Sequence, residues 1–462
     1  MNQSSSPPRV YGNKWRLVAS AGVALIVLVL LAHWGGSTTT GPLFALGIAV
    51  LSVLILAFSA LVWWLYLSPL PAQVGRPVER SAQVRQALAA LVVISGVLFT
   101  IGAFWDEVWH RRYGINLNDF LWPPHLMIYG SMGLTSLFAG GGLFFALSGS
   151  GDLRQRFRAE PRLGLLGLVS LYILASVPSD LLWHEIYGLD ISAWSLPHVL
   201  LVGGFTLVML IGISLQLSLA PPRPWSGLRG LSGREFLALV LSVLAALLLT
   251  QFGATEWDNI AAIDPGQNTA FWNRPEWLYP VVVIVVALFI GNFVLHTIRR
   301  AGAATLVGLL VLGVRLILLA SFGAGDVGLG FFSHLLLLPP LIALDVWYAL
   351  RLRYAEEQAT HVGGSLIAGV VFLAIGLPAI AGSLVYPRVT GETLPGMIGF
   401  GLAAAIAAGG IGARMGNWLR ALDQPAEETI PISPRVAWIG LGMVAVTLAL
   451  VAVFVVTARP PV

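Results

Sequence analysis

Long apolar stretches, separated by short polar connectors, make up most of the chain. A helix needs about 20 mostly apolar residues to cross the hydrocarbon layer of a membrane. Backbone groups in lipid must hydrogen-bond within their own segment, so each stretch is predicted to be a helix. Thirteen stretches meet this description, at 15–34, 42–67, 84–108, 122–148, 162–184, 196–220, 234–255, 276–298, 302–322, 329–350, 363–386, 394–414 and 436–457.

This pattern predicts an all-α fold, a polytopic integral membrane helix bundle of about 13 transmembrane helices. The connectors are too short to form a separate soluble domain. We divide the chain into an N-terminal two-helix segment at 1–83, a region of four helical hairpins at 84–352 and a C-terminal three-helix segment at 353–462. The lipid bilayer is the expected partner of all three.

The composition fits a membrane protein and excludes several other classes. Of the 462 residues, 57% are hydrophobic and only 10% are charged, too few to cover a soluble domain. Basic residues outnumber acidic ones by only 26 to 22, so the charge gives no support to a nucleic-acid partner. Cysteine is absent. Any metal must therefore be bound by His, Asp, Glu or backbone oxygen.

Basic residues fall mainly in alternate connectors, which predicts the orientation of the chain. One set of connectors holds 20 of the 26 basic residues, and Arg315 lies inside a span. The other set holds only Arg111, Arg112, Arg274, Arg388 and Arg459. By the positive-inside rule, the N-terminus is cytoplasmic and the C-terminus lies outside a bacterial-type plasma membrane. We interpret the first apolar run as a retained helix, because no clear cleavage site follows it.

One segment of the sequence occurs twice. Residues 106–125 and 180–198 both contain D-x-x-W-H-x-x-Y-G, then a short loop, then P-H. Seven identical positions at matched spacing indicate an internal repeat. A weaker third copy has Glu276 in the position of the last His, and a fourth keeps only Asp326 and His334. The repeat predicts that spans 3–4, 5–6, 7–8 and 9–10 form parallel hairpins with their loops on the outer face.

The repeat carries side chains suited to metal binding. Asp106 and His110 are four residues apart, which places them on one face of a helix. His125 follows Pro at the start of the next helix, where the helix dipole favours the neutral, metal-binding imidazole. Such a set suits copper, zinc or iron. The predicted ligands are Asp106, His110, His125, Asp180, His184 and His198, and the predicted supporting residues are Glu276, Arg315, Asp326 and His334.

A structural interpretation of the same residues stays open. Each Asp would then hydrogen-bond its own His and fix the hairpin, while the second His of each copy would point to lipid or to backbone. Trp and Tyr would belong to an interfacial belt, and Pro-His would mark a helix start. The position of the second His therefore separates the two interpretations.

Residues 106–125 resemble the metal-binding segment of the C subunit of copper membrane monooxygenases, the particulate methane and ammonia monooxygenase family. The residues that carry the resemblance, in the family's order, are Asp106, Trp109, His110, Asp119, Phe120, Pro123, Pro124 and His125. The resemblance implies that Asp106, His110 and His125 are copper ligands, with three counterparts in the second copy, which lacks the Asp-Phe pair. It covers about 20 residues per copy.

Three classes of function fit these observations. The first is a membrane protein with a metal site, for copper-dependent redox chemistry or copper handling. The second is a transporter or permease for a cation or small solute, favoured by the hairpins, by the acidic outer connectors and by Arg315 within a span. The third is a structural membrane subunit without chemistry. The sequence leaves open whether the chain is an enzyme, and whether it forms oligomers or joins other subunits.

Overall fold

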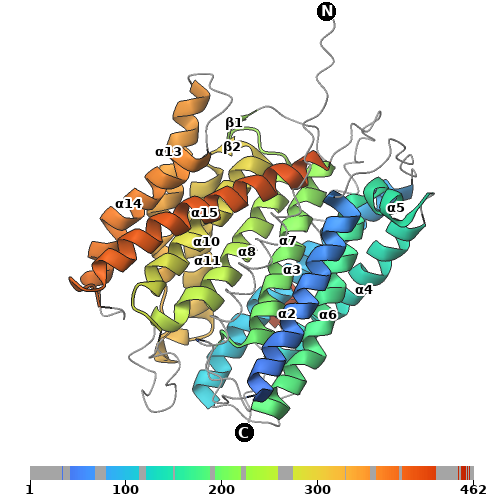
Figure 1. Cartoon of the computed structure of the whole chain (residues 1–462), viewed down its shortest axis with the longest axis horizontal. Helices are drawn as coiled ribbons and strands as arrows, with labels where there is room; N and C mark the ends of the chain where they lie inside the picture. Colours follow the sequence, from blue (N-terminus) through green and yellow to red (C-terminus); the bar gives the residue numbers. More distant parts are fainter. Residues whose placement is uncertain are drawn as a thin grey trace, which may run out of the picture.

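The computed structural model shows a bundle of tilted helices (Figure 1). Ten helices in the described part of the chain are long and apolar enough to cross a membrane. The prediction of an all-α, multi-pass membrane protein is therefore confirmed. The structure describes residues 34, 42–67, 80–113, 121–148, 151–187, 193–219, 225–258, 274–327, 329–353, 361–383, 388–422, 446, 449–453, 455 and 457.

The helices follow one another with short connections, and the strands are only two residues long. The α-helices are α2 (Pro42–Val62), α3 (Arg80–Tyr113), α4 (Pro123–Leu147), α5 (Leu153–Ala159), α6 (Pro161–Tyr187), α7 (Leu196–Ser218), α8 (Gly233–Asp258), α10 (Leu278–Ile298), α11 (Ala303–Ser321), α12 (Phe332–Leu336), α13 (Leu338–Arg353), α14 (His361–Ala381) and α15 (Leu394–Ala421). A π-helical turn (Trp63–Leu67), a 3₁₀ turn (Ala324–Val327) and the parallel pair β1 (Ser226–Gly227) and β2 (Arg300–Ala301) complete the described elements.

The ten spanning helices correspond to the third to twelfth predicted spans. The tenth span comprises α12 and α13, which meet at Leu337, where the backbone angles stay right-handed helical. The predicted span at 42–67 corresponds to α2 and the π-helical turn that follows it. The predicted spans at 15–34 and 436–457 lie almost entirely outside the described residues, so the total of 13 stays a prediction.

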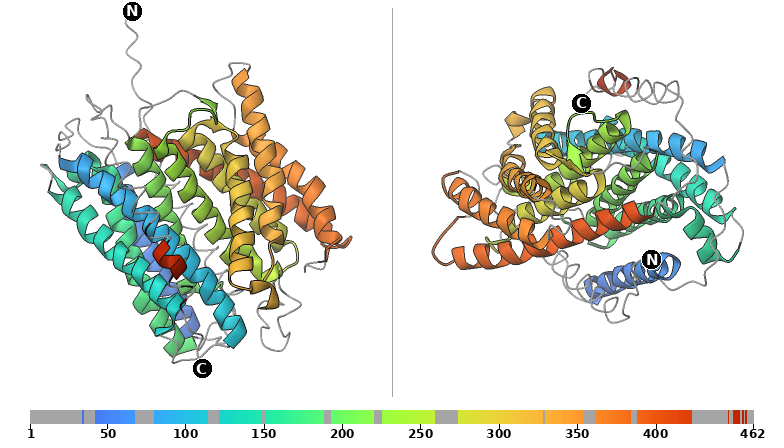
Figure 2. Two further views of the ribbon diagram at one scale, coloured as in Figure 1. Left: turned by 180° about the vertical axis from the view of Figure 1, so that it is seen from behind. Right: turned by 90° about the horizontal axis from the view of Figure 1, so that it is seen from above.

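The helices occupy distinct places in the bundle. In Figure 1, α4 and α5 lie at one edge, α13 and α14 lie at the opposite edge, and α15 runs obliquely across the face between them. The view from above in Figure 2 shows the same two edges. Sequential helices α3 and α4, α6 and α7, and α7 and α8 pack against each other, as expected for short connections.

Small residues allow α10 and α15 to touch almost backbone to backbone. A Cβ atom at Gly412 would overlap the carbonyl oxygen of Phe289, and one at Gly409 would overlap the side chain of Ser365. Close approach through glycine is the usual basis of helix packing in a membrane. Moving an apolar side chain from lipid into a helix contact gains little free energy, because lipid is itself apolar. The run of small residues at 396–412 therefore joins α15 to its neighbours.

Helix α8 lies in the centre of the protein and positions the polar residues described below. Its buried residues run from Glu235 at the first turn to Trp257 at the last. At one end, Arg300 donates to Glu235, at 2.8 Å, beside the β1–β2 pair. At the other end, Gln251 and Glu256 contact α3 and the residues before α7. The ends of α3, α7 and α8 are thereby held together at that side of the bundle.

Candidate metal centre

Asp106, His110 and His125 meet where α3 ends and α4 begins. His125 Nε2 lies 2.8 Å from Asp106 Oδ1, and His110 Nε2 lies 3.3 Å from the same oxygen. One potential ligand atom from each of the three residues lies within 4.8 Å of the other two. The three side chains therefore form a group that could hold a metal ion.

The local sequence explains how the group forms. Asp106 and His110 are one turn apart on α3, so both side chains point the same way. Helix α4 starts at Pro123, after Trp122 in an extended conformation, and Pro at the first positions costs no hydrogen bond. His125 is thus fixed in the first turn of α4 and faces the last turns of α3.

The separations fit a ligand set and also fit a hydrogen-bonded group of one carboxylate and two imidazoles. Both imidazoles approach the same carboxylate oxygen, Asp106 Oδ1, at hydrogen-bond distance. Two ligands at about 2.1 Å from a common ion lie about 3.0–3.4 Å apart at octahedral or tetrahedral angles. The observed separations are close to this range. The predicted clasp had His125 pointing to lipid or backbone, whereas the structure turns His125 toward Asp106.

Aromatic rings form one wall of the centre. The ring of Trp122 lies 5.5 Å from that of His110 and 6.3 Å from that of His125, and Trp109 is buried behind it. The side chains of Asp106, His110 and His125 are 22%, 23% and 16% exposed. The oxygen that both imidazoles approach, Asp106 Oδ1, is itself buried.

A neighbouring ion pair limits the positive charge near the centre. Arg111 follows His110 on α3, and its guanidinium donates to Glu107 Oε1 at 3.0 Å. Glu107 also accepts a hydrogen bond of 2.6 Å from Gln251. Arg111 is thus paired with a carboxylate, which reduces its repulsion of a cation at Asp106.

The second copy of the repeat is only partly visible. His198 is the third residue of α7, just as His125 is the third residue of α4, and its Nε2 lies 3.9 Å from Asp180 Oδ1. This distance is longer than the corresponding 2.8 Å in the first copy. The side chain of His184 lies outside the described residues. The second ligand set, like the internal repeat itself, stays a prediction.

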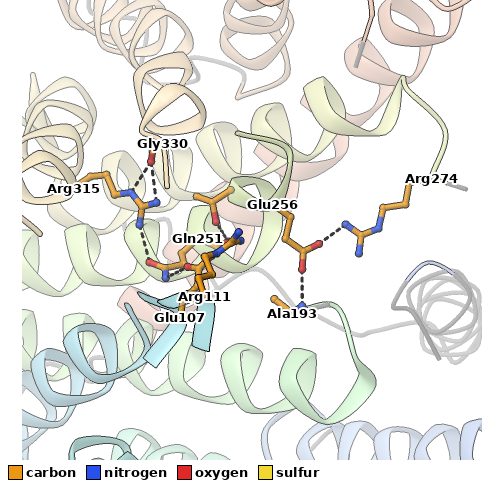
Figure 3. Close-up of polar contacts among 9 residues, drawn as sticks. Glu107, Arg111, Ala193, Gln251, Glu256, Arg274, Arg315 and Gly330 are labelled. Atoms are coloured by element: carbon orange, nitrogen blue, oxygen red, sulfur yellow. Dashed lines mark hydrogen bonds and ion pairs between the residues drawn. The ribbon is translucent and has the colours of Figure 1, made fainter. Parts of the chain in front are cut away.

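The predicted supporting residues do not gather at the centre. Arg315 is fully buried and donates to Gly330 O and to Gln251 Oε1, both neutral acceptors (Figure 3). His334 is fully buried beside Arg315. Glu276 has no described contact with the three ligands, and the side chain of Asp326 lies outside the described residues.

A chain of polar side chains that the sequence did not reveal starts next to the centre. Gln251 donates to Glu107 and accepts from Arg315, and Arg315 also lies over the ring of Phe104 at 4.7 Å. The chain therefore connects α3, α8 and α11 (Figure 3). The signal in the sequence was Gln251, a neutral polar residue inside an apolar span. Its position alone did not indicate Glu107 and Arg315 as its partners.

A second buried ion pair lies near the start of α7. Arg274 donates to Glu256 at 2.6 Å and stacks over Trp194 at 4.2 Å, while Glu256 also accepts from the backbone N–H of Ala193 (Figure 3). Burying two charges is tolerated where their hydrogen bonds are satisfied. This pair fixes the chain that leads into α7, and with it the position of His198.

Comparison with known proteins yields no match. No protein-family model matches the sequence, and no curated protein or solved structure matches it.

Proposed function

We propose that this chain is an integral membrane protein that binds a transition-metal ion through Asp106, His110 and His125 and serves copper-dependent redox chemistry or copper handling. The observation that carries the proposal is the approach of two imidazoles, from two helices, to one carboxylate oxygen at 2.8 and 3.3 Å. In a membrane, ionisable side chains are costly and are usually retained for function.

The donor set limits the choice of metal. Two imidazoles and one carboxylate suit copper, zinc and iron, whereas magnesium and calcium prefer oxygen ligands. Cysteine is absent from the chain, so no thiolate competes for the ion. The resemblance of residues 106–125 to the copper membrane monooxygenases favours copper within this group.

The residues around the centre would each have a defined part. Asp106 would supply the negative charge that offsets the ion, and His110 and His125 would supply neutral nitrogen ligands. Trp122 would shield one side of both rings, leaving coordination positions on the accessible side. When bound, copper would supply one-electron chemistry. In copper handling, the ion itself would be the cargo. The positive-inside rule places this centre on the outer side of the membrane.

Metal analysis of the purified protein tests the proposal. We expect about one copper ion per chain in detergent after loading and desalting, and a large loss in the double variant His110→Ala/His125→Ala. His361→Ala is the matched control, because His361 also begins a helix but lies on α14. Equal metal content in all three proteins would refute the proposal and favour a structural role. A second bound ion that is lost in His198→Ala would show that the second copy of the repeat also binds metal.

A transporter for a cation or small solute is the alternative function. The observation in its favour is the buried chain from Glu107 through Gln251 to Arg315, which places charged and polar groups inside the membrane. Flux assays in proteoliposomes distinguish the two functions. A cation flux that persists in His110→Ala/His125→Ala would favour transport without the metal centre.

A further inference from the structure

An apolar groove lies between α14 and α15 on the surface of the bundle. Helix α14 is at one edge of the protein, and α15 packs beside it (Figure 1). The groove has a volume of about 550 Å³ and is open to its surroundings. All the side chains that line it are apolar, and its two walls include Val370, Leu373, Leu377, Leu394, Ile398 and Leu402.

The sequence explains where the groove begins and ends. Near the middle of the two helices, Gly369 of α14 lies close to Ala405 of α15, and a Cβ atom at Gly369 would be 2.8 Å from that of Ala405. From there toward the connector between the helices, both carry larger apolar side chains on the facing surfaces. The groove therefore extends from mid-helix to the connector, where Val389 also lines it.

The described residues of the first and last predicted spans lie away from this groove. Val451 packs in a cluster with residues of α3 and α11. The ring of Trp34 packs against Trp277, and the ring of Trp277 lies 4.4 Å from that of Phe400 on α15. Successive residues of a helix are about 100° apart, so Phe400 lies about 200° around α15 from Ile398, which lines the groove. Neither contact brings a described part of the chain over the groove.

The connector end of the groove carries positive charge. Leu394 lines the groove and is the first residue of α15, where the helix dipole is positive. Arg388 precedes Val389, and its carbonyl oxygen accepts a hydrogen bond of 3.1 Å from the Thr393 hydroxyl, which fixes it beside that helix start. Arg388 is exposed and forms no ion pair with a residue that the structure describes. Glu392, exposed in the same connector, offsets part of this charge.

These features together select the ligand. An unfilled apolar groove loses the van der Waals contacts that a hydrocarbon chain would supply. A cavity of about 150 Å³ holds benzene, so the groove has room for a long acyl chain. The positive charge at its connector end suits a negatively charged headgroup. An uncharged apolar molecule, such as a quinone, would fill the groove without using Arg388.

We propose that the groove between α14 and α15 binds one anionic phospholipid. An acyl chain lies along the groove, and the headgroup lies at Arg388 and the start of α15. The lipid thereby connects the two helices where their side chains do not meet. In the orientation predicted from the basic residues, it belongs to the outer leaflet. The site is separate from Asp106, His110 and His125 and does not require a metal there.

Native mass spectrometry of the delipidated full-length protein tests this inference. Phosphatidylglycerol, or phosphatidylcholine with the same acyl chains, is added in detergent with a chelator, so that the metal centre cannot contribute. The wild type should bind one phosphatidylglycerol more tightly than phosphatidylcholine. Arg388→Gln should reduce this preference about fivefold, the usual contribution of one basic residue beside anionic lipid. Ala374→Trp places a ring in the groove and should weaken the binding of both lipids at least about tenfold.

Matched controls and a second variant keep the test decisive. Arg414→Gln and Ala407→Trp change exposed residues of α15 outside the groove and should bind both lipids as the wild type does. If Ala374→Trp does not fold, Ile398→Trp fills the same groove from α15. Equal phosphatidylglycerol binding in the wild type and the groove variant, or an unchanged preference in Arg388→Gln, would overturn the proposal. So would an apolar molecule other than a phospholipid that copurifies with the wild type and is lost in Ala374→Trp.

Discussion

His125 Nε2 lies 2.8 Å from Asp106 Oδ1, closer than His110, which is on the same helix as the carboxylate. The shorter contact is therefore the one between helices. A local clasp between Asp106 and His110 would not require it. The arrangement joins the end of α3 to the start of α4.

Lowering the pH is expected to release the metal. Imidazole binds an ion only through an unprotonated nitrogen and titrates at about pH 6.5 in water. Copper affinity should therefore be high above this pH and should fall below about pH 6, as protons compete for His110 and His125. Competition against a chelator of known affinity, across this pH range, measures the effect. An affinity that is constant with pH would contradict imidazole ligation.

Removing the charge of Asp106 should weaken metal binding strongly. Substitutions of residues that only hydrogen-bond a ligand cost about 10–100-fold in affinity, so Asp106→Asn, which alters a ligand, should cost at least about 100-fold. Metal titration followed by calorimetry measures the loss. Asp180→Asn is the matched control for the first site. A loss in Asp180→Asn equal to that in Asp106→Asn would mean that the two copies share one ion.

Replacing Arg315 should destabilise the fold. Arg315→Met leaves the buried acceptors Gly330 O and Gln251 Oε1 without their donor, and each lost partner costs about 1–3 kcal/mol. Thermal unfolding in detergent, followed by circular dichroism, should show a lower midpoint. Arg111→Met is the control, because Arg111 is 21% exposed and a pair of that kind contributes about 1 kcal/mol or less. Equal effects would show that burial of Arg315 is not decisive.

The contact between α10 and α15 should be sensitive to a single methyl group. In Gly412→Ala, the new Cβ would overlap the carbonyl oxygen of Phe289, and overpacking of this kind costs about 1–3 kcal/mol. Gly399→Ala on the same helix is the control, since no atom lies within 4 Å of the position that its new methyl group would take. Unfolding in detergent compares the two variants. A neutral Gly412→Ala would mean that the helices can separate without cost.

The orientation can be measured with introduced cysteines, because the natural chain has none. Leu121, before α4, is 71% exposed, and Leu153, at the start of α5, is 40% exposed. The bias of basic residues predicts that Leu121→Cys reacts with an impermeant reagent in intact cells and that Leu153→Cys reacts only after lysis. The reverse pattern would place the metal centre on the cytoplasmic side.

The sequence allowed the spanning helices to be predicted, because apolar length is a local property that lipid enforces. It also indicated that Asp106, His110 and His125 would come together, since four-residue spacing and the Pro-His helix start are local signals. The junction of α12 and α13 at Leu337 had a signal that was missed. Pro339 and Pro340 lack N–H groups, so two helical hydrogen bonds are missing at this junction.

The polar chain around Arg315 could not be predicted in the same way. Gln251 and Glu107 are 144 residues apart, and Arg315 and Gln251 are 64 residues apart, so the contacts depend on how distant helices pack. A neutral amide in an apolar span has no charge pattern that would indicate its partner. The fold gives Arg315 an amide oxygen and a carbonyl oxygen as acceptors, and the sequence indicated neither of them.

The contacts of Arg315 also impose an order on how the protein is made. Translation proceeds from the N-terminus, so Glu107 and Gln251 enter the membrane before Arg315 leaves the ribosome. A guanidinium exposed to lipid is costly, so α11 is best inserted next to an already assembled α3 and α8. The carbonyl of Gly330 is synthesised only afterwards and completes the coordination of the guanidinium. Truncated chains that end after α11 should therefore already retain this helix through Gln251.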